Sequence, residues 1–240
     1  MESPLLRVAD YQHVVFFTGA GVSAESGVPT YRGRGGIWKH YDYERYASQP
    51  AFERNPEEVW RFHNVRRERV AKCLPNAAHR CIAACEAHAE HVSVITQNID
   101  GLHQRAGSNV VHELHGSLWR SRCDDCGYTA TEFDAPLRDV RCPHCPAYKR
   151  PDIVWFGDAL DPAVFEIATQ ALIRCDLLVS IGTSALVYPA AELPMLARRH
   201  GARLVEINPE PTPMSPQFDT CLRTTASAGL DRLLGAFDPS

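Results

Sequence analysis

Four short apolar runs are the clearest pattern along the chain. They cover residues 13–18, 92–96, 177–181 and 204–207, and the first reads His-Val-Val-Phe-Phe-Thr. Such runs, when turn signals bound them, are typical of strands that are buried in a parallel sheet. Glycine or polar residues follow each of them: Gly19-Ala20-Gly21, Gln97-Asn98, Gly182-Thr183-Ser184 and Asn208. The pattern predicts four buried strands, the first turning directly into a helix.

Helical patterns separate these strands and predict the fold class. Residues 162–173 and 189–200 read as helices between strands, which favours an open α/β sheet with its ligand site beyond the carboxyl ends of the strands. Within 34–90, Asn55-Pro56-Glu57-Glu58 is a helix start, and Pro75-Asn76 ends that helix and opens another. We expect a Rossmann-like parallel-sheet domain (1–33, 91–118 and 151–240), a cofactor loop with a helical insertion (34–90) and a small zinc module (119–150).

Composition and charge narrow the function classes. The 240 residues are 45% hydrophobic and 22% charged, which is ordinary for a globular chain, and the net charge of −4 argues against direct nucleic-acid binding by charge. No run of 18 apolar residues predicts a membrane span, and the first residues lack the pattern of a secretory signal. Nine cysteines, an odd number, argue against a secreted disulfide framework. We expect a cytoplasmic protein; its oligomeric state is left open.

Four of the cysteines carry the strongest local signal. They form two Cys-x-x-Cys pairs, Cys123 with Cys126 and Cys142 with Cys145. Four thiolates at this spacing match a tetrahedral zinc site that has no position open for water. The sequence therefore predicts one structural zinc, with His144 as a bystander.

The turn after the first strand is a candidate phosphate site. Gly19-x-Gly21-x-x-Ala24 fits a turn whose backbone amides hold a pyrophosphate. The acid expected at the end of a second strand is missing, which makes an ordinary hydride-transfer dehydrogenase doubtful. The basic, glycine-rich stretch 31–36 closes over phosphates or is an ordinary flexible loop.

Two further motifs carry polar groups suited to a nucleotide. Gln97, Asn98 and Asp100 lie at a predicted strand end, where they recognise a carboxamide and a ribose or simply form a capped turn. His115 stands between an apolar stretch and a glycine, a place where a lone histidine is more often structural than catalytic.

Taken together, these motifs resemble the sirtuins, the NAD-dependent protein-lysine deacylases. The resemblance covers about residues 10 to 235. It rests on the segments 19–27, 96–103, 115–117, 182–184 and 207–208 and on the two cysteine pairs, which occur in one order.

The resemblance implies a reaction and a set of residue roles. NAD is consumed as a cosubstrate: the acyl-lysine oxygen attacks the ribose carbon that bears nicotinamide, and nicotinamide and O-acyl-ADP-ribose are released. His115 matches the general base, a role that suits an imidazole. The implied cofactor-binding residues are Gly19, Ala20, Gly21, Ala24, Arg32, Gln97, Asn98, Asp100, Gly182, Thr183, Ser184, Asn208 and Ala226. Acyl-lysine proteins or peptides are the implied partners, and the segment 151–157, with Val154, Trp155, Phe156 and Gly157, resembles the strand that pairs with the substrate backbone.

One helical face bears on the acyl group. His63 and Arg66 lie three residues apart beside an apolar stripe, where the guanidinium forms a salt bridge or binds an anion. Sirtuins that prefer succinyl- or malonyl-lysine resemble this helix, with Ala24 making room, although they carry tyrosine where this chain has His63. We expect desuccinylase or demalonylase activity with deacetylation as a second activity, and an acidic-acyl preference that rises as His63 charges between pH 8 and pH 6.5.

Three alternatives remain open from the sequence. In the first, the enzyme is mainly a deacetylase. In the second, it acts at the same cofactor site as a mono-ADP-ribosyltransferase or an NAD glycohydrolase. In the third, the chain is a catalytically silent nucleotide-binding or zinc-stabilised interaction module. The intact His115, Asn98 and Asp100 argue against the last of these.

Overall fold

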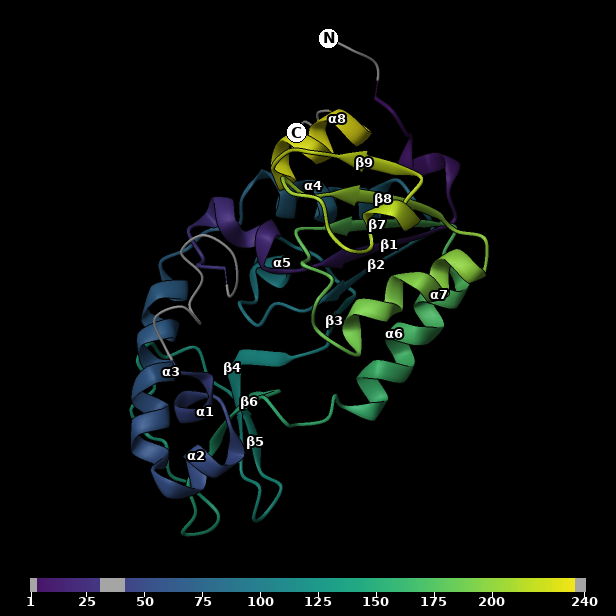
Figure 1. The fold of residues 1–240 in the computed structure, drawn as a ribbon. Helices are drawn as coiled ribbons and strands as arrows, with labels where there is room; N and C mark the ends of the chain where they lie inside the picture. Colours follow the sequence, from purple (N-terminus) through teal and green to yellow (C-terminus); the bar gives the residue numbers. More distant parts are fainter. Residues whose placement is uncertain (1–3, 31–41, 236–240) are drawn as a thin grey trace.

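Two sheets organise the computed structural model, which describes residues 4–30 and 42–235 (Figure 1). The strands are β1 (His13–Thr18), β2 (His91–Thr96), β3 (Val111–Glu113), β4 (Gly116–Arg122), β5 (Thr129–Thr131), β6 (Arg150–Ile153), β7 (Leu177–Ile181), β8 (Arg203–Ile207) and β9 (Thr220–Leu222). The α-helices are α1 (Tyr43–Tyr46), α2 (Gln49–Arg54), α3 (Pro56–Ala71), α4 (Ala77–Ala84), α5 (Leu102–Arg105), α6 (Pro162–Arg174), α7 (Leu193–Arg199) and α8 (Ala226–Leu234).

The larger sheet confirms the predicted Rossmann-like α/β fold. Its strand order is β3-β2-β1-β7-β8-β9, and all neighbouring strands are parallel. The four apolar runs form β1, β2, β7 and β8, the interior strands. The chain order reverses at β1, which pairs with β2 on one side and β7 on the other. A ligand crevice is expected at such a switch point, beyond the carboxyl ends of the strands.

Alternating side chains bury both faces of this sheet. Val14 and Phe16 of β1 pack in the cluster that α4 and α8 cover, whereas Val15 and Phe17 pack in the cluster that α6 and α7 cover. Figure 1 shows α4 and α8 on one side of the sheet and α6 and α7 on the other. Successive strand residues point to opposite faces of the sheet. A sheet with helices on both faces therefore requires strands that are apolar at every position.

The predicted helix starts are confirmed. The Asn55 side chain accepts a hydrogen bond from the Glu58 N–H at the start of α3, and Asn76 forms a reciprocal cap with His79 at the start of α4. The turn after β1 is helical as expected, but it is a 3₁₀ helix, Ala20–Ser26, rather than an α-helix.

The smaller unit joins the helical insertion to the cysteine-bearing segment. Its antiparallel sheet has the order β5-β4-β6 and shares one apolar core with α2 and α3. The helix α4 packs on the large sheet through Ala78 and Ile82, and β4 and β6 both belong to the small sheet.

Two further expectations from the sequence concern the cofactor loop and membrane spans. Arg32 and the glycine-rich stretch 31–36 fall outside the described residues. Within residues 4–30 and 42–235, no helix is long and apolar enough to cross a membrane.

Arg67 fastens α3 to the small sheet. Its side chain is fully buried, and its guanidinium donates to the backbone carbonyls of Leu118, Glu132 and Asp134. The group also lies 5.0 Å from the centre of the Trp119 ring. Because five N–H groups need acceptors, a buried guanidinium suits a place where loop carbonyls converge.

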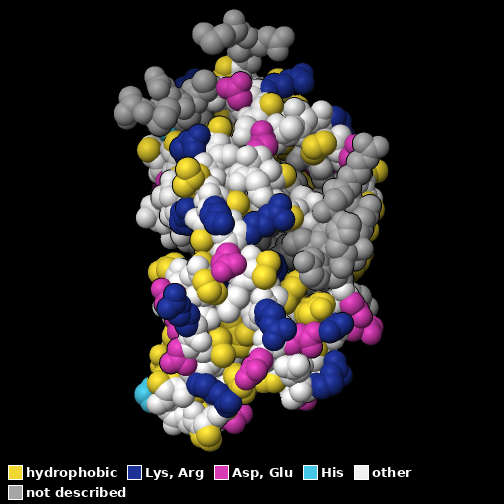
Figure 2. Space-filling model, turned by 90° about the vertical axis from the view of Figure 1, so that its left-hand side faces the viewer, with side chains coloured by type: hydrophobic (Ala, Val, Ile, Leu, Met, Phe, Trp, Pro, Cys, Tyr) yellow, Lys and Arg dark blue, Asp and Glu magenta, His cyan; other side chains and the backbone are white. Residues whose placement is uncertain are grey.

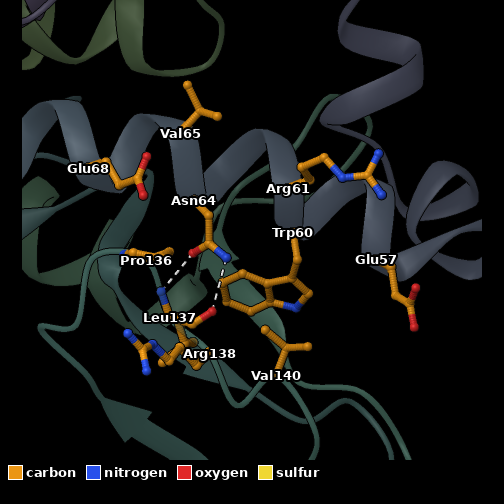
Figure 3. A pocket seen from close by; sticks show the side chains of 10 residues that line it. All are labelled: Glu57, Trp60, Arg61, Asn64, Val65, Glu68, Pro136, Leu137, Arg138 and Val140. Atoms are coloured by element: carbon orange, nitrogen blue, oxygen red, sulfur yellow. Dashed lines mark hydrogen bonds between the residues drawn. The ribbon is translucent and has the colours of Figure 1, made fainter.

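A second contact lies on the same side of α3, about one turn before Arg67. The Asn64 side chain exchanges two hydrogen bonds with the backbone of Leu137, at 2.9 and 3.0 Å (Figure 3). This pair forms part of a hollow of about 370 Å³ that also includes Trp60, Arg61 and Val65. Figure 2, which views this side of the molecule, shows hydrophobic side chains among charged ones in its lower half.

We predict that Arg67→Met lowers the free energy of unfolding by about 3–5 kcal/mol, because one buried and two partly buried backbone carbonyls lose their donor. Urea denaturation followed by circular dichroism measures this change. The matched control is Arg69→Met on the exposed face of the same helix, expected within about 0.5 kcal/mol of wild type. Equal stabilities for the two variants would contradict this role of Arg67.

Candidate active site

One cavity of about 1150 Å³ extends from the carboxyl ends of β1, β2, β7 and β8 to α3 of the smaller unit. The sequence-predicted residues on its wall are Gly19, Ala20, Gly21, Ala24, His63, Arg66, Gln97, Asn98, His115, Val154, Trp155, Phe156, Gly157, Gly182, Thr183, Ser184, Asn208 and Ala226. Asp100 is not on this wall. The structure thus brings nearly all the candidates together from segments that are far apart in the sequence.

Further wall residues were not singled out from the sequence. About half of them lie in 186–189 and 209–213, after the strand-end motifs of β7 and β8, and three more lie in 158–160. The sequence does contain a signal for the first two segments, because both segments contain proline and follow strand ends, where loops pass over the ligand crevice.

Two glycine turns meet at the base of the cavity. The Gly21 N–H donates to the Gly182 carbonyl at 2.9 Å, and the Gly19 N–H donates to the Ile181 carbonyl at 3.0 Å. A Cβ atom on Gly21 would lie 2.5 Å from the Cα of Gly182, which itself has a φ of 62°. Only glycine allows this approach of backbone to backbone, and it leaves a floor of small residues suited to a diphosphate.

Asp100 lies behind the cavity wall and holds it. It accepts hydrogen bonds from the Ser23 hydroxyl at 2.7 Å and the Leu102 N–H at 2.9 Å, and the Asn98 amide donates to the same Ser23 oxygen at 3.1 Å. Burial raises the pKa of Asp100, while its hydrogen bonds to Leu102 and Ser23 oppose that shift. The carboxyl group therefore connects the Gly-rich turn to the Asn98 strand end.

Two buried histidines, to which the sequence analysis assigned no role, extend this network. His79 contacts the Ser23 hydroxyl at 3.3 Å, and His103 contacts the Thr18 hydroxyl at 3.0 Å. Their rings lie 4.8 Å apart. Burial lowers the pKa of His79 to about 4 and that of His103 to about 3, so both are neutral near pH 7.

His115 lies where the chain passes from the large sheet to the small one. Its Nδ1 is 3.0 Å from the Gln97 carbonyl, an oxygen that can only accept, so Nδ1 carries the proton and Nε2 keeps a lone pair. Burial lowers the pKa of His115, and the Gln97 carbonyl partly opposes this shift. The neutral form, which is able to take a proton, therefore prevails at neutral pH.

The helix α3 brings His63 and Arg66 to the same cavity. His63 is fully buried and lies 6.0 Å from the Trp155 ring in a stacked arrangement; its ring nitrogens make no well-aligned hydrogen bond among the described residues, although a contact with the Tyr46 backbone partly opposes the fall in its pKa. Burial holds its pKa well below the usual range, and the charge on Arg66 adds to this effect. The expectation that His63 becomes charged between pH 8 and pH 6.5 is therefore wrong, because the sequence does not show how completely the ring loses its water.

The segment after β6 lines the cavity opposite the glycine turns. The N–H groups of Val154, Trp155 and Phe156 donate to the His115 carbonyl, the Asp158 carboxylate and the Ala47 carbonyl. The segment is thus fixed to its neighbours through its own amides, and β6 itself ends at Ile153.

The four paired cysteines lie together in the small unit. Their sulfur atoms are all within 4.8 Å of one another, and the Cys123–Cys145 and Cys126–Cys142 distances are both 3.5 Å. A tetrahedron with zinc–sulfur bonds of about 2.3 Å has sulfur–sulfur edges of about 3.8 Å, so the cluster fits one zinc ion. His144 is not part of the cluster; its ring lies 4.8 Å from that of Tyr128.

Comparisons with known proteins agree with this geometry. The model of the Sir2 family matches residues 19–189. A "NAD-dependent protein deacylase 2" of Pyrobaculum aerophilum is 46% identical over 229 residues, which cover 95% of this chain and 92% of that protein.

Two solved structures have the same fold. A complex of a Sir2 homologue with NAD has a TM-score of 0.89 and 42% identity, and the match covers 95% of this chain and 90% of that one. A Sir2 protein with a deacetylated p53 peptide and 3′-O-acetyl ADP ribose has a TM-score of 0.84 and 34% identity, with 94% of both chains covered.

We predict that the folded protein carries one zinc ion per chain and that Cys142→Ser loses it. Removing one of four thiolates should lower the Tm by roughly 5–10 °C, which corresponds to about 2–3 kcal/mol for a chain of this size. Elemental analysis and differential scanning calorimetry measure the two effects, with Cys81→Ser, a half-buried cysteine outside the cluster, as the control. Folded wild-type protein without zinc would contradict the prediction.

Proposed function

The chain belongs to the Sir2 family and is an NAD-dependent protein deacylase, and from that premise we propose that it removes succinyl or malonyl groups as well as acetyl groups from lysine side chains. The observation that carries the proposal is that His63 and Arg66 line the same cavity as His115 and the glycine turns. The products are nicotinamide and O-acyl-ADP-ribose.

The cavity suits NAD by its shape and its polar groups. Gly19, Gly21 and Gly182 offer a floor without side chains for the diphosphate, with Ala20 and Ala24 beside it. Thr183, Ser184, Asn208 and Ala226 surround the adenosine side, while Gln97 and Asn98 lie toward the nicotinamide side and Asp100 supports them from behind. Arg32 is assigned to the diphosphate end by the family resemblance alone. NAD supplies the ribose carbon that accepts the acyl oxygen and releases nicotinamide.

His115 acts as the general base. Its Nε2 lone pair takes a proton from a ribose hydroxyl, while the Gln97 carbonyl fixes the ring through Nδ1. A pKa below the usual value keeps the imidazole unprotonated at working pH, which a base requires.

The acyl-lysine chain enters between the two units. Because the amides of Val154, Trp155 and Phe156 are bonded within the protein, a substrate backbone pairs with the segment's other main-chain groups, up to Gly157. Main-chain pairing selects weakly among neighbouring side chains, so the acyl group dominates the specificity.

Arg66 binds the distal carboxylate of an acidic acyl group. A guanidinium matches a carboxylate in charge and in the spacing of its donors. His63 is neutral, so it offers an N–H beside Arg66 but no second positive charge. The alternative role for Arg66 is a structural salt bridge, and an assay of acyl preference distinguishes this role from carboxylate binding.

We predict that His115→Ala reduces kcat by about 10²–10⁴-fold, because the base is lost, while ADP-ribose still binds in isothermal titration. In the wild type, the acid limb of the pH–rate profile should lie below pH 6.5, since burial lowers the pKa of His115 and activity is lost only as that group protonates. The exposed histidine variant His200→Ala is the control. Turnover near the wild-type rate in His115→Ala would contradict the role.

We predict that Arg66→Met lowers kcat/KM for a succinyl-lysine peptide at least about tenfold and leaves the acetyl-lysine peptide much less affected, because a charged hydrogen bond is worth about 1.5–3 kcal/mol. The ratio of succinyl to acetyl activity should stay constant between pH 8 and pH 6.5, because His63 does not titrate in this range. The matched control is Arg61→Met, which changes an arginine of the same helix that lines the hollow on its other side (Figure 3). An equal loss of both activities in Arg66→Met would make Arg66 a structural residue and the enzyme mainly a deacetylase.

A further inference from the structure

Glu206 is a buried carboxylate that the reaction does not use. It is the second-last residue of β8 and is only 2% exposed. Three side chains donate to it: the hydroxyls of Thr212 at 2.7 Å and Ser215 at 2.6 Å, and the guanidinium of Arg223 at 2.6 Å. Burying a carboxylate costs free energy because the group loses its water. The three donors offset that cost and hold the group in place.

One of these donors, Thr212, belongs to a loop that lines the cavity, and Ser215 follows shortly after that loop. Residues 208–213 follow β8, line the cavity, and include Pro209, Pro211 and Pro213. Proline has no N–H, so this loop has few backbone donors with which to hold its own shape. Thr212 therefore anchors the loop from its far end, where its N–H also donates to the Ser215 hydroxyl at 2.8 Å.

The same carboxylate bears on Asn208 through Arg223. The Arg223 Nη1 that donates to Glu206 also lies 3.5 Å from the carbonyls of Asn208 and Glu210. The Asn208 side chain in turn donates to the Thr183 carbonyl at 2.7 Å, across the cavity floor. Glu206, Arg223 and Asn208 thus link the loop to the turn after β7.

We propose that Glu206 is a positioning residue for nucleotide binding, which holds the loop 208–213 in the shape that receives the adenosine end of NAD. The inference rests on the proposed placement of NAD in the cavity. When the anchor is weakened, the loop occupies its receiving shape for only part of the time, and apparent affinity falls in proportion to that fraction. Chemistry at the His115 end is unaffected once the nucleotide is bound.

The test is Glu206→Gln, studied by steady-state kinetics and by titration with ADP-ribose. The amide keeps the size of the side chain but turns an N–H₂ toward donors, so KM for NAD and Kd for ADP-ribose should rise about tenfold. The kcat at saturating NAD, the KM for the acyl peptide and the inhibition constant of nicotinamide should stay at their wild-type values. Glu166→Gln, an exposed acid on α6, is the matched control.

A structural role alone predicts a different result. A Glu206→Gln variant with a lower Tm but wild-type affinity for ADP-ribose would overturn the proposal. If Glu206→Gln does not fold, Thr212→Val and Ser215→Ala each remove one donor and leave the carboxylate; each should weaken ADP-ribose binding several-fold, and unchanged binding in both would overturn the proposal equally. Failure of the wild-type protein to bind ADP-ribose would instead refute the NAD site itself.

Discussion

The contact between the backbones of Gly21 and Gly182 is the constraint on which the cavity depends. It joins the turn after β1 to the turn after β7, the two strands between which the order of the sheet reverses. A Cβ atom on either glycine would come within 2.5 Å of the other's backbone, so any side chain here would force the turns apart. With the turns closed, the crevice has a floor of backbone and small residues, and larger side chains line the rest of its wall.

Buried charged groups hold that rim, because most of it is loop. Asp100 fastens the Gly-rich turn through Ser23, Glu206 fastens the loop after β8, and Arg67 fastens α3 through loop carbonyls. Each of these groups lies outside the cavity and faces partners from more than one segment. A loop has few backbone hydrogen bonds of its own, so its shape is held by side chains with several donors or acceptors. These side chains lose their own hydration when they are buried.

The sequence predicts those parts of the molecule that depend on local pattern. The apolar runs predict the four interior strands, the cysteine spacing predicts the cluster, and strand ends identify most of the cavity wall. It does not predict which of two adjacent arginines is buried, because the carbonyls of Leu118, Glu132 and Asp134 that accept from Arg67 come from segments distant in the sequence. Nor does it predict the neutral state of His63, because that state depends on the exclusion of water from the ring by Phe62 and Trp155, which pack against it in the folded protein.

The position of His115 couples the two units of the protein. Leu114, just before it, donates its N–H to the Thr96 carbonyl at the end of β2, while the His115 carbonyl accepts from Val154 beside the small sheet. The imidazole itself is held by the Gln97 carbonyl, again on the large sheet. The glycine turns on the cavity wall come from the large sheet, whereas His63 and Arg66 come from α3, so a rotation of one unit against the other would change the distance between α3 and His115. Arg67 and Asn64 attach α3 to the rest of the smaller unit, so the helix and the small sheet form one body, and the hydrogen bond from the Val154 N–H to the His115 carbonyl is among the links between this body and the residues that follow the large sheet.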